Sequence, residues 1–535
     1  MPDLSSPFPF APATHIGPAR PRSAAIVNLG CKVNQSEMEA AARLLRAAAV
    51  PLVDPHEAAD LYLVNTCTVT STADEKSRSA VRRARRANPR AQVVVTGCSV
   101  AVDPAAFAVV DAGARLVDNA DKAAFLAELE GLLRLGDGAA AGTAPGAGPG
   151  GAWTAPGAGP GDAGRPDAPL DAALPTMSGV EAVAAARVDG VDDDRASVER
   201  TRAFVKVQDG CSFHCTYCII PRARGDERSL APDVVLADVR RALAAGHREI
   251  VLTGINIGTY DGGWSERGAR GSHVRSALTL AGLVQRLLDE TDVERIRLSS
   301  IEPQHVDDDL LEAWVRGAPR TLPHLHLPLQ SGDDGVLRRM GRRYTAAEYA
   351  RVVGRARAAI PGVAVHADVI AGFPTEDDQA FARSIAFIRE LDPARLHVFR
   401  YSARPGTPAT RMTGQVDERT KKVRAGELLA VAADARAGFA RRGLGTETRV
   451  LVESRLLDGR WVGHAGDHVL VAVTPRPDDP DDLENAILTV RRMAIDPGAT
   501  ERVTGEILHV DPAPRTLRAG PLALAGSPAN QGGDA

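Results

Sequence analysis

Between residues 23 and 135 the hydrophobic positions form short apolar runs, each followed by a stretch with helical periodicity. The runs SAAIVNLGC, ADLYLVNTC and AQVVVTGCS each predict a buried strand, and ARLVDN predicts a weaker fourth. Helical patterns follow near 35–48, 73–87 and 122–135. Apolar strands that alternate with amphipathic helices are typical of a parallel sheet covered on both faces. We therefore predict an N-terminal parallel α/β domain over residues 23–135.

The same alternation returns after residue 200 and continues for six units, separated by helical stretches such as 232–245 and 346–359. The predicted strands lie at 203–208, 249–256, 295–301, 324–330, 364–372 and 396–402. Six consecutive strand–helix units favour an open, partial (β/α)6 barrel over 200–441, with functional residues at the carboxyl ends of its strands. A helix near 417–441 closes it.

The segments that flank this barrel have different patterns. Residues 136–195 are rich in Gly, Ala and Pro and contain the octapeptide TAPGAGPG twice, which predicts a disordered linker. Short strands parted by turn residues, TRVLVE, RWVGHAG, HVLVAV and AILTVRRM, predict a small β-barrel over 445–511. Residues 512–535 are again rich in Pro, Gly and Ala and are predicted to be disordered.

Composition narrows the class of protein. The 535 residues are 44% hydrophobic and 25% charged, values typical of a globular protein with roughly two to four domains. Because 64 Lys and Arg face 68 Asp and Glu, nucleic-acid binding would depend on local basic patches. The chain has no signal-peptide pattern, no apolar run long enough for a bilayer and only six cysteines, so we expect a cytoplasmic protein without a membrane partner.

Three cysteines lie within the segment DGCSFHCTYC, directly after the first predicted barrel strand. Cys211, Cys215 and Cys218, the contiguous triad, have the spacing C-x3-C-x2-C. Closed zinc sites use four protein ligands, and no histidine stands at zinc-finger spacing after these thiols. A [4Fe–4S] cluster held by three thiolates leaves one iron open to another ligand. The contiguous triad therefore predicts such an open cluster.

The other three cysteines are far apart in sequence but share a topological position. Cys31, Cys67 and Cys98, the dispersed triad, each follow a predicted strand of the N-terminal domain. The carboxyl ends of parallel strands lie at one edge of a sheet, where such folds bind ligands. We therefore expect these three thiols to converge as a second set of metal ligands. Burial as three small hydrophobic side chains is the alternative.

Several segments together resemble the radical S-adenosylmethionine (SAM) methylthiotransferases, most closely the MtaB type. CSFHCTYC is similar to the radical SAM signature, and NLGCKVNQSE, NTCTVTSTADEKSR, RIRLSSIEP, HLHLPLQSG and RRMGRRYT extend the resemblance over 23–135 and 200–511. It implies a methylthiotransferase domain, a radical SAM barrel and a C-terminal TRAM RNA-binding barrel. The activity implied is insertion of a methylthio group at C2 of N6-threonylcarbamoyladenosine at position 37 of tRNA.

The resemblance also implies cofactors and partners. The contiguous triad would hold the [4Fe–4S] cluster that binds and cleaves SAM, and the dispersed triad an auxiliary [4Fe–4S] cluster that carries sulfur. An electron donor such as flavodoxin or ferredoxin, and a source of sulfur, are further implied. Residues expected to contact SAM or the substrate lie in the cysteine loop or at barrel strand ends: Tyr217, Thr253, Gly254, Ser299, Gln330 and Asp368. Strand-end capping or loop packing is the alternative for the polar ones.

Two basic regions are candidates for contact with tRNA. The first is the predicted helix in KSRSAVRRARRANPR, where arginines near one face would contact phosphates: Arg78, Arg82, Arg85 and Arg86. A solvated helix face is the alternative. The C-terminal barrel has few basic residues and the acidic insertion PRPDDPDDLEN, so RNA binding there would depend on its remaining arginines: Arg449, Arg460, Arg491 and Arg492.

Other functions fit parts of this pattern. Related methylthiotransferases act on isopentenyladenosine at position 37 of tRNA or on an aspartate of a ribosomal protein, and the domain architecture does not separate these activities. From another class, a non-catalytic RNA-binding protein with structural metal sites is the alternative. That function requires four-ligand sites, which two groups of three cysteines do not supply.

Overall fold

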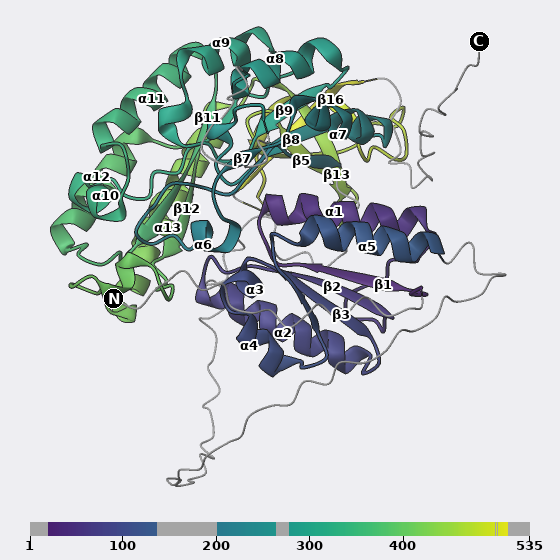
Figure 1. The fold of residues 1–535 in the computed structure, drawn as a ribbon. Helices are drawn as coiled ribbons and strands as arrows, with labels where there is room; N and C mark the ends of the chain where they lie inside the picture. The colour runs from purple at the N-terminus through teal and green to yellow at the C-terminus, as the bar shows by residue number, and fades with distance from the viewer. Residues whose placement is uncertain (1–19, 136–200, 264–277, 498, 500, 512–535) are drawn as a thin grey trace, which may run out of the picture.

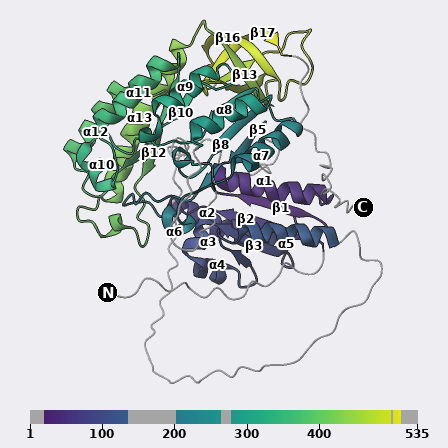
Figure 2. The same cartoon turned by 45° about the horizontal axis from the view of Figure 1, so that its top comes forward.

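The computed structural model describes residues 20–135, 201–263, 278–497, 499 and 501–511. The predicted linker at 136–195 and the predicted tail at 512–535 lie outside these residues. Figure 2 shows the described part as three bodies, with the yellow C-terminal strands at the top, the teal and green barrel in the middle and the purple N-terminal domain beneath it. Within the described ranges, every helix is too short or too polar to cross a bilayer.

The N-terminal domain is built on a four-stranded parallel sheet. In sheet order its strands are β1 (Ala24–Asn28), β2 (Leu61–Thr66), β3 (Gln92–Gly97) and β4 (Arg115–Val117). One face is covered by α1 (Lys32–Ala47) and α5 (Lys122–Leu135), and the other by α2 (Ser71–Ala87), α3 (Cys98–Val102) and α4 (Pro104–Val110) (Figure 1). The strands bury apolar side chains on both faces, which gives two cores and confirms the predicted parallel α/β fold.

The larger barrel contains the six predicted strands in sequence order. They are β5 (Arg202–Lys206), β8 (Glu249–Thr253), β9 (Arg295–Leu298), β10 (His324–His326), β11 (Ala364–Ala371) and β12 (Arg395–Arg400). All pairings are parallel, and β9 and β10 are joined by two isolated bridges. Because β5 and β12 do not pair, the barrel is open, as predicted.

Helices cover the outside of the larger barrel and share one apolar core with its strands. They are α7 (Pro232–Ala244), α8 (Leu280–Glu290), α9 (Asp308–Arg316), α10 (Asp334–Met340), α11 (Ala346–Ala359), α12 (Asp378–Leu391) and α13 (Glu418–Arg442). The short α6 (Ile220–Arg224) is different, because it lies at the junction with the N-terminal domain (Figure 1).

The C-terminal strands form a closed five-stranded barrel. Its strands, in order around the barrel, are β13 (Glu447–Arg455), β14 (Trp461–Ala465), β15 (Leu470–Val473), β17 (Arg502–Val510) and β16 (Ile487–Ile495). The β-barrel prediction is confirmed, but β17 was not predicted. Only Val503 and Ile507 of this strand are fully buried, so its sequence lacks a clear two-residue alternation.

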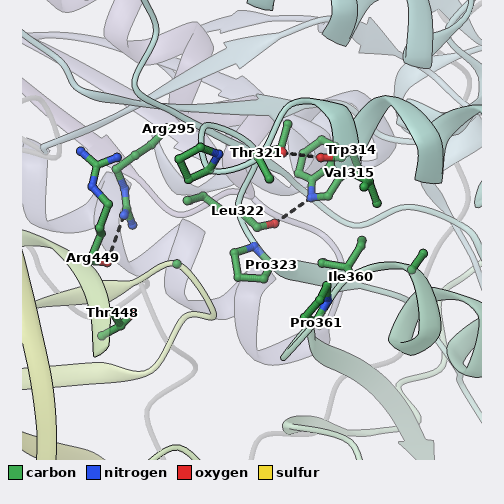
Figure 3. Close-up of a pocket in the computed structure, with 14 residues that line it drawn as sticks. Arg295, Trp314, Val315, Thr321, Leu322, Pro323, Ile360, Pro361, Thr448 and Arg449 are labelled. Carbon is green, nitrogen blue, oxygen red and sulfur yellow. Dashed lines mark hydrogen bonds between the residues drawn. The ribbon is translucent and has the colours of Figure 1, made fainter. Parts of the chain in front are cut away.

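A cavity of about 300 Å³ lies between the two barrels, at the amino ends of β9 and β10. Figure 3 shows Trp314, Leu322 and Pro323 of the larger barrel facing Arg449 of the smaller one. The indole of Trp314 donates to the carbonyl of Leu322 at 2.8 Å, which satisfies its only polar group. Ligands of such barrels bind at the carboxyl ends of the strands, so this cavity lies at the opposite end from the expected site.

Candidate two-cluster site

The contiguous triad lies in a loop closed by a two-residue antiparallel hairpin, β6 (Gln208–Asp209) with β7 (Arg228–Ser229). The backbone N–H of Cys211 donates to the carbonyl of Gly225 at 3.1 Å and narrows the loop. Gly210 has φ +70°, and a Cβ there would lie 1.9 Å from the carbonyl oxygen of Asp226, so only glycine fits. The chain reaches this hairpin directly from β5, which places the three thiols at the carboxyl end of the barrel.

The cysteine loop is fastened to the barrel from outside its own sequence. The backbone N–H of Thr216 donates to the carbonyl of Met340 at 2.9 Å, and its hydroxyl donates to the carbonyl of Arg339 at 2.8 Å. Arg342, in the same RRMGRRYT segment, donates to the sulfur of Cys215 at 3.4 Å. Its guanidinium also forms an ion pair with Glu302. Sequence reasoning quoted this segment as a family motif but assigned Arg342 no role.

The dispersed triad converges as its topology predicted. Cys31 precedes the first residue of α1, Cys67 directly follows β2, and Cys98 is the first residue of α3. Burial, together with the neighbouring sulfurs of Cys31 and Cys98, raises the pKa of the Cys67 thiol to about 12. That mutual influence places the three thiols in one electrostatic environment. All six cysteines of the chain are free thiols.

A single buried guanidinium connects the two triads. Arg224 is the last residue of α6, six positions after Cys218, and its side chain is fully buried. Its Nε donates to the sulfur of Cys98 at 3.3 Å. The other nitrogens donate to carboxylates at 2.9 and 3.1 Å and to an amide oxygen at 2.6 Å, on Asp209, Glu37 and Asn34. The helix that leaves one triad therefore contacts the other.

A second contact repeats this connection. The side-chain amide of Asn119 donates to the carbonyl of Ala223 in α6 at 2.8 Å and lies 3.8 Å from the sulfur of Cys98. Lys122 forms an ion pair with Glu37, and Lys206 of β5 lies 3.3 Å from the same carboxylate. The junction between the domains is therefore a buried polar network, which sequence reasoning missed because its members lie in different domains.

Four of the six thiols are costly to ionise without a positive partner: Cys67, Cys98, Cys211 and Cys218. Burial raises the pKa of Cys98 and Cys211, and it raises the pKa of Cys218 to about 12. A metal centre and a nearby cation both offset the cost of a buried thiolate. Each triad receives one guanidinium at a sulfur, from Arg224 or from Arg342.

The ligand set of each triad differs from that of a closed zinc site. A structural Zn²⁺ is held by four protein ligands. All six cysteines of the chain belong to the two triads, so neither triad has a fourth thiol. Three thiolates with one open iron fit a [4Fe–4S] cluster better.

The residues expected to contact SAM lie around the carboxyl ends of β8 to β11. Thr253 is the buried last residue of β8, and a Cβ on Gly254 would lie 2.7 Å from the Ile257 side chain, so glycine allows close packing there. The hydroxyl of Ser299 is buried and has no hydrogen-bond partner in the described part of the chain, and the same is true of the side-chain amide of Asn256. Such orphaned groups fit a polar ligand.

The remaining candidates have partners within the protein. Half-buried Tyr217 packs edge-on against Phe373, with ring centroids 6.3 Å apart. Gln330 has φ +70° and continues the sheet through a bridge to Val369. Asp368 accepts hydrogen bonds from two histidines that sequence reasoning did not single out: His326 Nε2 at 2.8 Å and His397 Nδ1 at 3.0 Å.

The basic candidates divide into exposed and paired arginines. In α2, Arg82 and Arg86 are exposed and Arg78 is half-buried. Arg85 is instead part of the fold, since its guanidinium lies 2.8 Å from Asp111 and donates to the carbonyls of Pro89 and Ala91. In the C-terminal barrel each candidate forms an ion pair with a carboxylate, and Arg492 is buried: Arg449, Arg460, Arg491 and Arg492.

Comparisons with known proteins agree with the division of the chain into an N-terminal domain and a larger barrel. The profile of the uncharacterized protein family UPF0004 matches residues 23–117, and that of the Radical SAM superfamily matches residues 205–388. The chain is 37% identical to threonylcarbamoyladenosine tRNA methylthiotransferase MtaB of Bacillus subtilis, over 75% of this chain and 78% of that one. Identity to the protein of the same name from Thermotoga maritima is 32%, over 82% and 88%. Identity to tRNA-2-methylthio-N(6)-dimethylallyladenosine synthase of Maricaulis maris is 31%, over 87% and 93%.

Proposed function

The chain belongs to the MtaB family of threonylcarbamoyladenosine tRNA methylthiotransferases, and we propose that it inserts a methylthio group at C2 of N6-threonylcarbamoyladenosine at position 37 of tRNA. The observation that carries the proposal is the pair of cysteine triads joined by α6 and Arg224. A reaction that activates a C–H bond and delivers sulfur to the same carbon needs two adjacent centres. The two cysteine triads at the junction of the two domains support this arrangement.

The residues present fit two [4Fe–4S] clusters and SAM. The contiguous triad would hold the SAM-binding cluster and the dispersed triad the auxiliary cluster, each with three thiolates and one open iron. Ser299 and Asn256 offer unpaired polar atoms near the strand ends where SAM would lie. When bound, the clusters and SAM supply the one-electron chemistry and the sulfur.

The protein's own contribution is to position the two centres and to keep water from them. Arg342 donates to the sulfur of Cys215, and Arg224 donates to the sulfur of Cys98, a thiol whose pKa burial raises. Because Arg224 also contacts Glu37 and Asp209, the position of α6 relative to the N-terminal domain is fixed by a buried network. This network sets the relative placement of the two triads.

Substrate and partners follow from the proposed activity. The exposed arginines of α2, Arg82 and Arg86, lie on the helix that begins four residues after Cys67 and are suited to the tRNA backbone. We assign the C-terminal barrel a secondary role in RNA binding, because its candidate arginines are engaged with carboxylates. A small electron-transfer protein and a sulfur source complete the reaction, which we place in the cytoplasm.

Nucleoside mass spectrometry of bulk tRNA tests the proposal. Cells that lack this protein should lose the methylthio mark on N6-threonylcarbamoyladenosine and retain every other methylthiolated nucleoside. Loss of the methylthio group from dimethylallyladenosine instead would assign the protein to the activity named for the Maricaulis maris relative. An unchanged nucleoside profile would contradict a tRNA substrate.

A further inference from the structure

Lys32 is the first residue of α1 and directly follows Cys31 of the dispersed triad. No side chain or carbonyl in the described residues forms a hydrogen bond or ion pair with its ammonium group. The barrel groups whose charges act on it are Arg202 of β5, Arg297 of β9 and Asp368 of β11. The ammonium therefore belongs to the N-terminal domain in sequence but lies in the electrostatic field of the barrel strands.

The packing of α1 explains this position. Glu37, one and a half turns along α1, forms an ion pair with Lys206 at the end of β5, at 3.3 Å. It also contacts Arg224, at 3.1 Å. In Figure 1 α1 lies along the side of the N-terminal domain that faces β5 and β13. The amino end of α1 is thus held against the barrel together with Cys31.

The charges around Lys32 do not balance. Arg295 and Arg297 share the carboxylate of Glu249, with both Nε–O distances at 2.8 Å. Arg202 is paired with Glu453 at 3.3 Å. Arg202 and Arg297 thus each have a carboxylate partner, whereas Lys32 has no direct partner among the described residues. A half-buried, unpaired ammonium is unfavourable, and its place at a helix amino end adds to the cost, so a bound anion would be strongly favoured.

Asp368 supplies a hydrogen-bond acceptor in the same field. Both histidine contacts, from His326 and His397, are to one oxygen, Oδ1. The other nitrogen of His326 lies 3.0 Å from the Ser300 hydroxyl, which fixes the ring. Among the described residues nothing donates to Oδ2 of Asp368, and the side chain is 18% exposed. A ligand can therefore reach this oxygen.

We propose that Lys32 binds the carboxylate of the threonylcarbamoyl group on the target adenine, and that Asp368 accepts a hydrogen bond from the hydroxyl or an N–H of the same group. The inference rests on the proposed function and names the feature of the substrate that is selected. The group on N6 lies at the base edge that also carries C2, so an anchor beside Cys31 holds C2 near the dispersed triad. A dimethylallyl group has no anion and would leave Lys32 unpaired.

The test compares two substrates in three forms of the enzyme. The RNAs are anticodon stem–loops that carry N6-threonylcarbamoyladenosine at position 37, either as the free acid or as its methyl ester. The enzymes are the reconstituted full chain and its Lys32→Met variant, with Arg43→Met as a matched control that removes an exposed charge from the same helix. The readouts are kcat/KM for methylthiolation, the affinity for each RNA, iron content, and 5′-deoxyadenosine formed without RNA.

The unaltered chain and Arg43→Met should prefer the acid over the ester by roughly 10- to 100-fold in kcat/KM and in affinity. With the acid RNA, kcat/KM and affinity should fall by a similar factor in Lys32→Met. This variant should prefer the acid over the ester by less than about threefold. Its iron content and 5′-deoxyadenosine formation should be unchanged. An unaltered acid preference in Lys32→Met would overturn the inference while the proposed function stands. If the unaltered chain methylthiolates neither RNA, the proposed function itself fails.

Discussion

The contiguous triad occupies eight residues of one loop, whereas the dispersed triad is assembled from the ends of three strands that span 68 positions of the sequence. The first depends on a hairpin and on contacts from Met340 and Arg342. The second depends on the register of β1, β2 and β3, in which Asn28 is level with Asn65 and Asn65 with Thr96. A local motif and a whole domain thus each produce a set of three free thiols.

This difference implies that a single change can disturb the arrangement of one triad and leave the other intact. A change in the sheet of the N-terminal domain should disturb the dispersed triad and leave the cysteine loop intact. A change in the RRMGRRYT segment should disturb the contiguous triad and leave the dispersed triad intact. Among the described residues, α6 links the two environments directly, because it follows the contiguous triad and its Arg224 contacts Cys98.

The largest expected effect is a difference between the triads in which reaction products are lost when a cysteine is replaced. Cys218→Ala should abolish both 5′-deoxyadenosine formation and methylthiolation, since the contiguous triad would bind SAM. Cys98→Ala should also abolish methylthiolation but keep most of the 5′-deoxyadenosine formation. Chromatography with mass spectrometry measures both products in one reaction. Equal loss of both products in the two variants would contradict the separate roles.

Removal of the shared arginine should have the next largest effect. Arg224→Met leaves Glu37 and Asp209 buried without that partner, so the free energy of unfolding should fall by roughly 3–5 kcal/mol. Methylthiolation should fall more than 5′-deoxyadenosine formation, because the guanidinium contacts Cys98. Chemical denaturation measures the stability, and Arg224→Lys should recover part of it. A variant as stable as the unaltered chain would show that the junction network is not stabilising.

The junction should also weaken in acid. Burial alone would raise the pKa of Glu37, but the neighbouring charges of Lys122, Arg224 and Lys206 hold it well below its ordinary value of 4.5. Because this pKa is lower in the folded state, its stabilising contribution is present at neutral pH and declines as the pH falls below about 4.5. Between pH 7 and pH 4, the free energy of unfolding should fall less for Glu37→Gln than for the unaltered chain. Chemical denaturation at the two pH values measures this difference. An identical pH dependence would rule out this contribution.

The smallest expected effect distinguishes exposed from paired arginines on α2. The double change Arg82→Ala and Arg86→Ala should weaken tRNA binding and reduce the slope of log affinity against log salt by about 2, one for each lost phosphate contact. Arg85→Ala should instead lower the melting temperature, since it breaks the contact with Asp111. Filter binding across a salt series checks the first result. If Arg85→Ala alone reduces the slope, the assignment of these residues is wrong.

Sequence patterns could predict the features that are repeated or local. The alternation of apolar runs and helices predicted both parallel sheets, and strand-end positions predicted that Cys31, Cys67 and Cys98 converge. The strand β17 was missed because only two of its side chains are fully buried. Arg224 and Arg342 were missed because their partners lie 126 and 127 positions away, and no periodic pattern records such a contact.

The hydrogen bonds of Asp368 show a further limit of prediction from the sequence. Its place on a barrel strand predicted a ligand contact, but not that one of its oxygens accepts from His326 and His397 while the other remains open. Lys32 was not singled out at all, because an unpaired charge is visible only once every neighbour has been placed. Pairing across domains is a property of the folded chain and has no local signature in the sequence.

The most direct test of the account is the iron content of anaerobically reconstituted protein in which one triad at a time has been replaced by alanine. Because each [4Fe–4S] cluster holds four irons, the unaltered chain should bind about eight irons and each triple variant about four. The dispersed-triad variant should still form 5′-deoxyadenosine from SAM, and the contiguous-triad variant should not. A chain that binds zinc in place of iron, or a dispersed-triad variant that still methylthiolates tRNA, would contradict the assignment of two clusters to two triads.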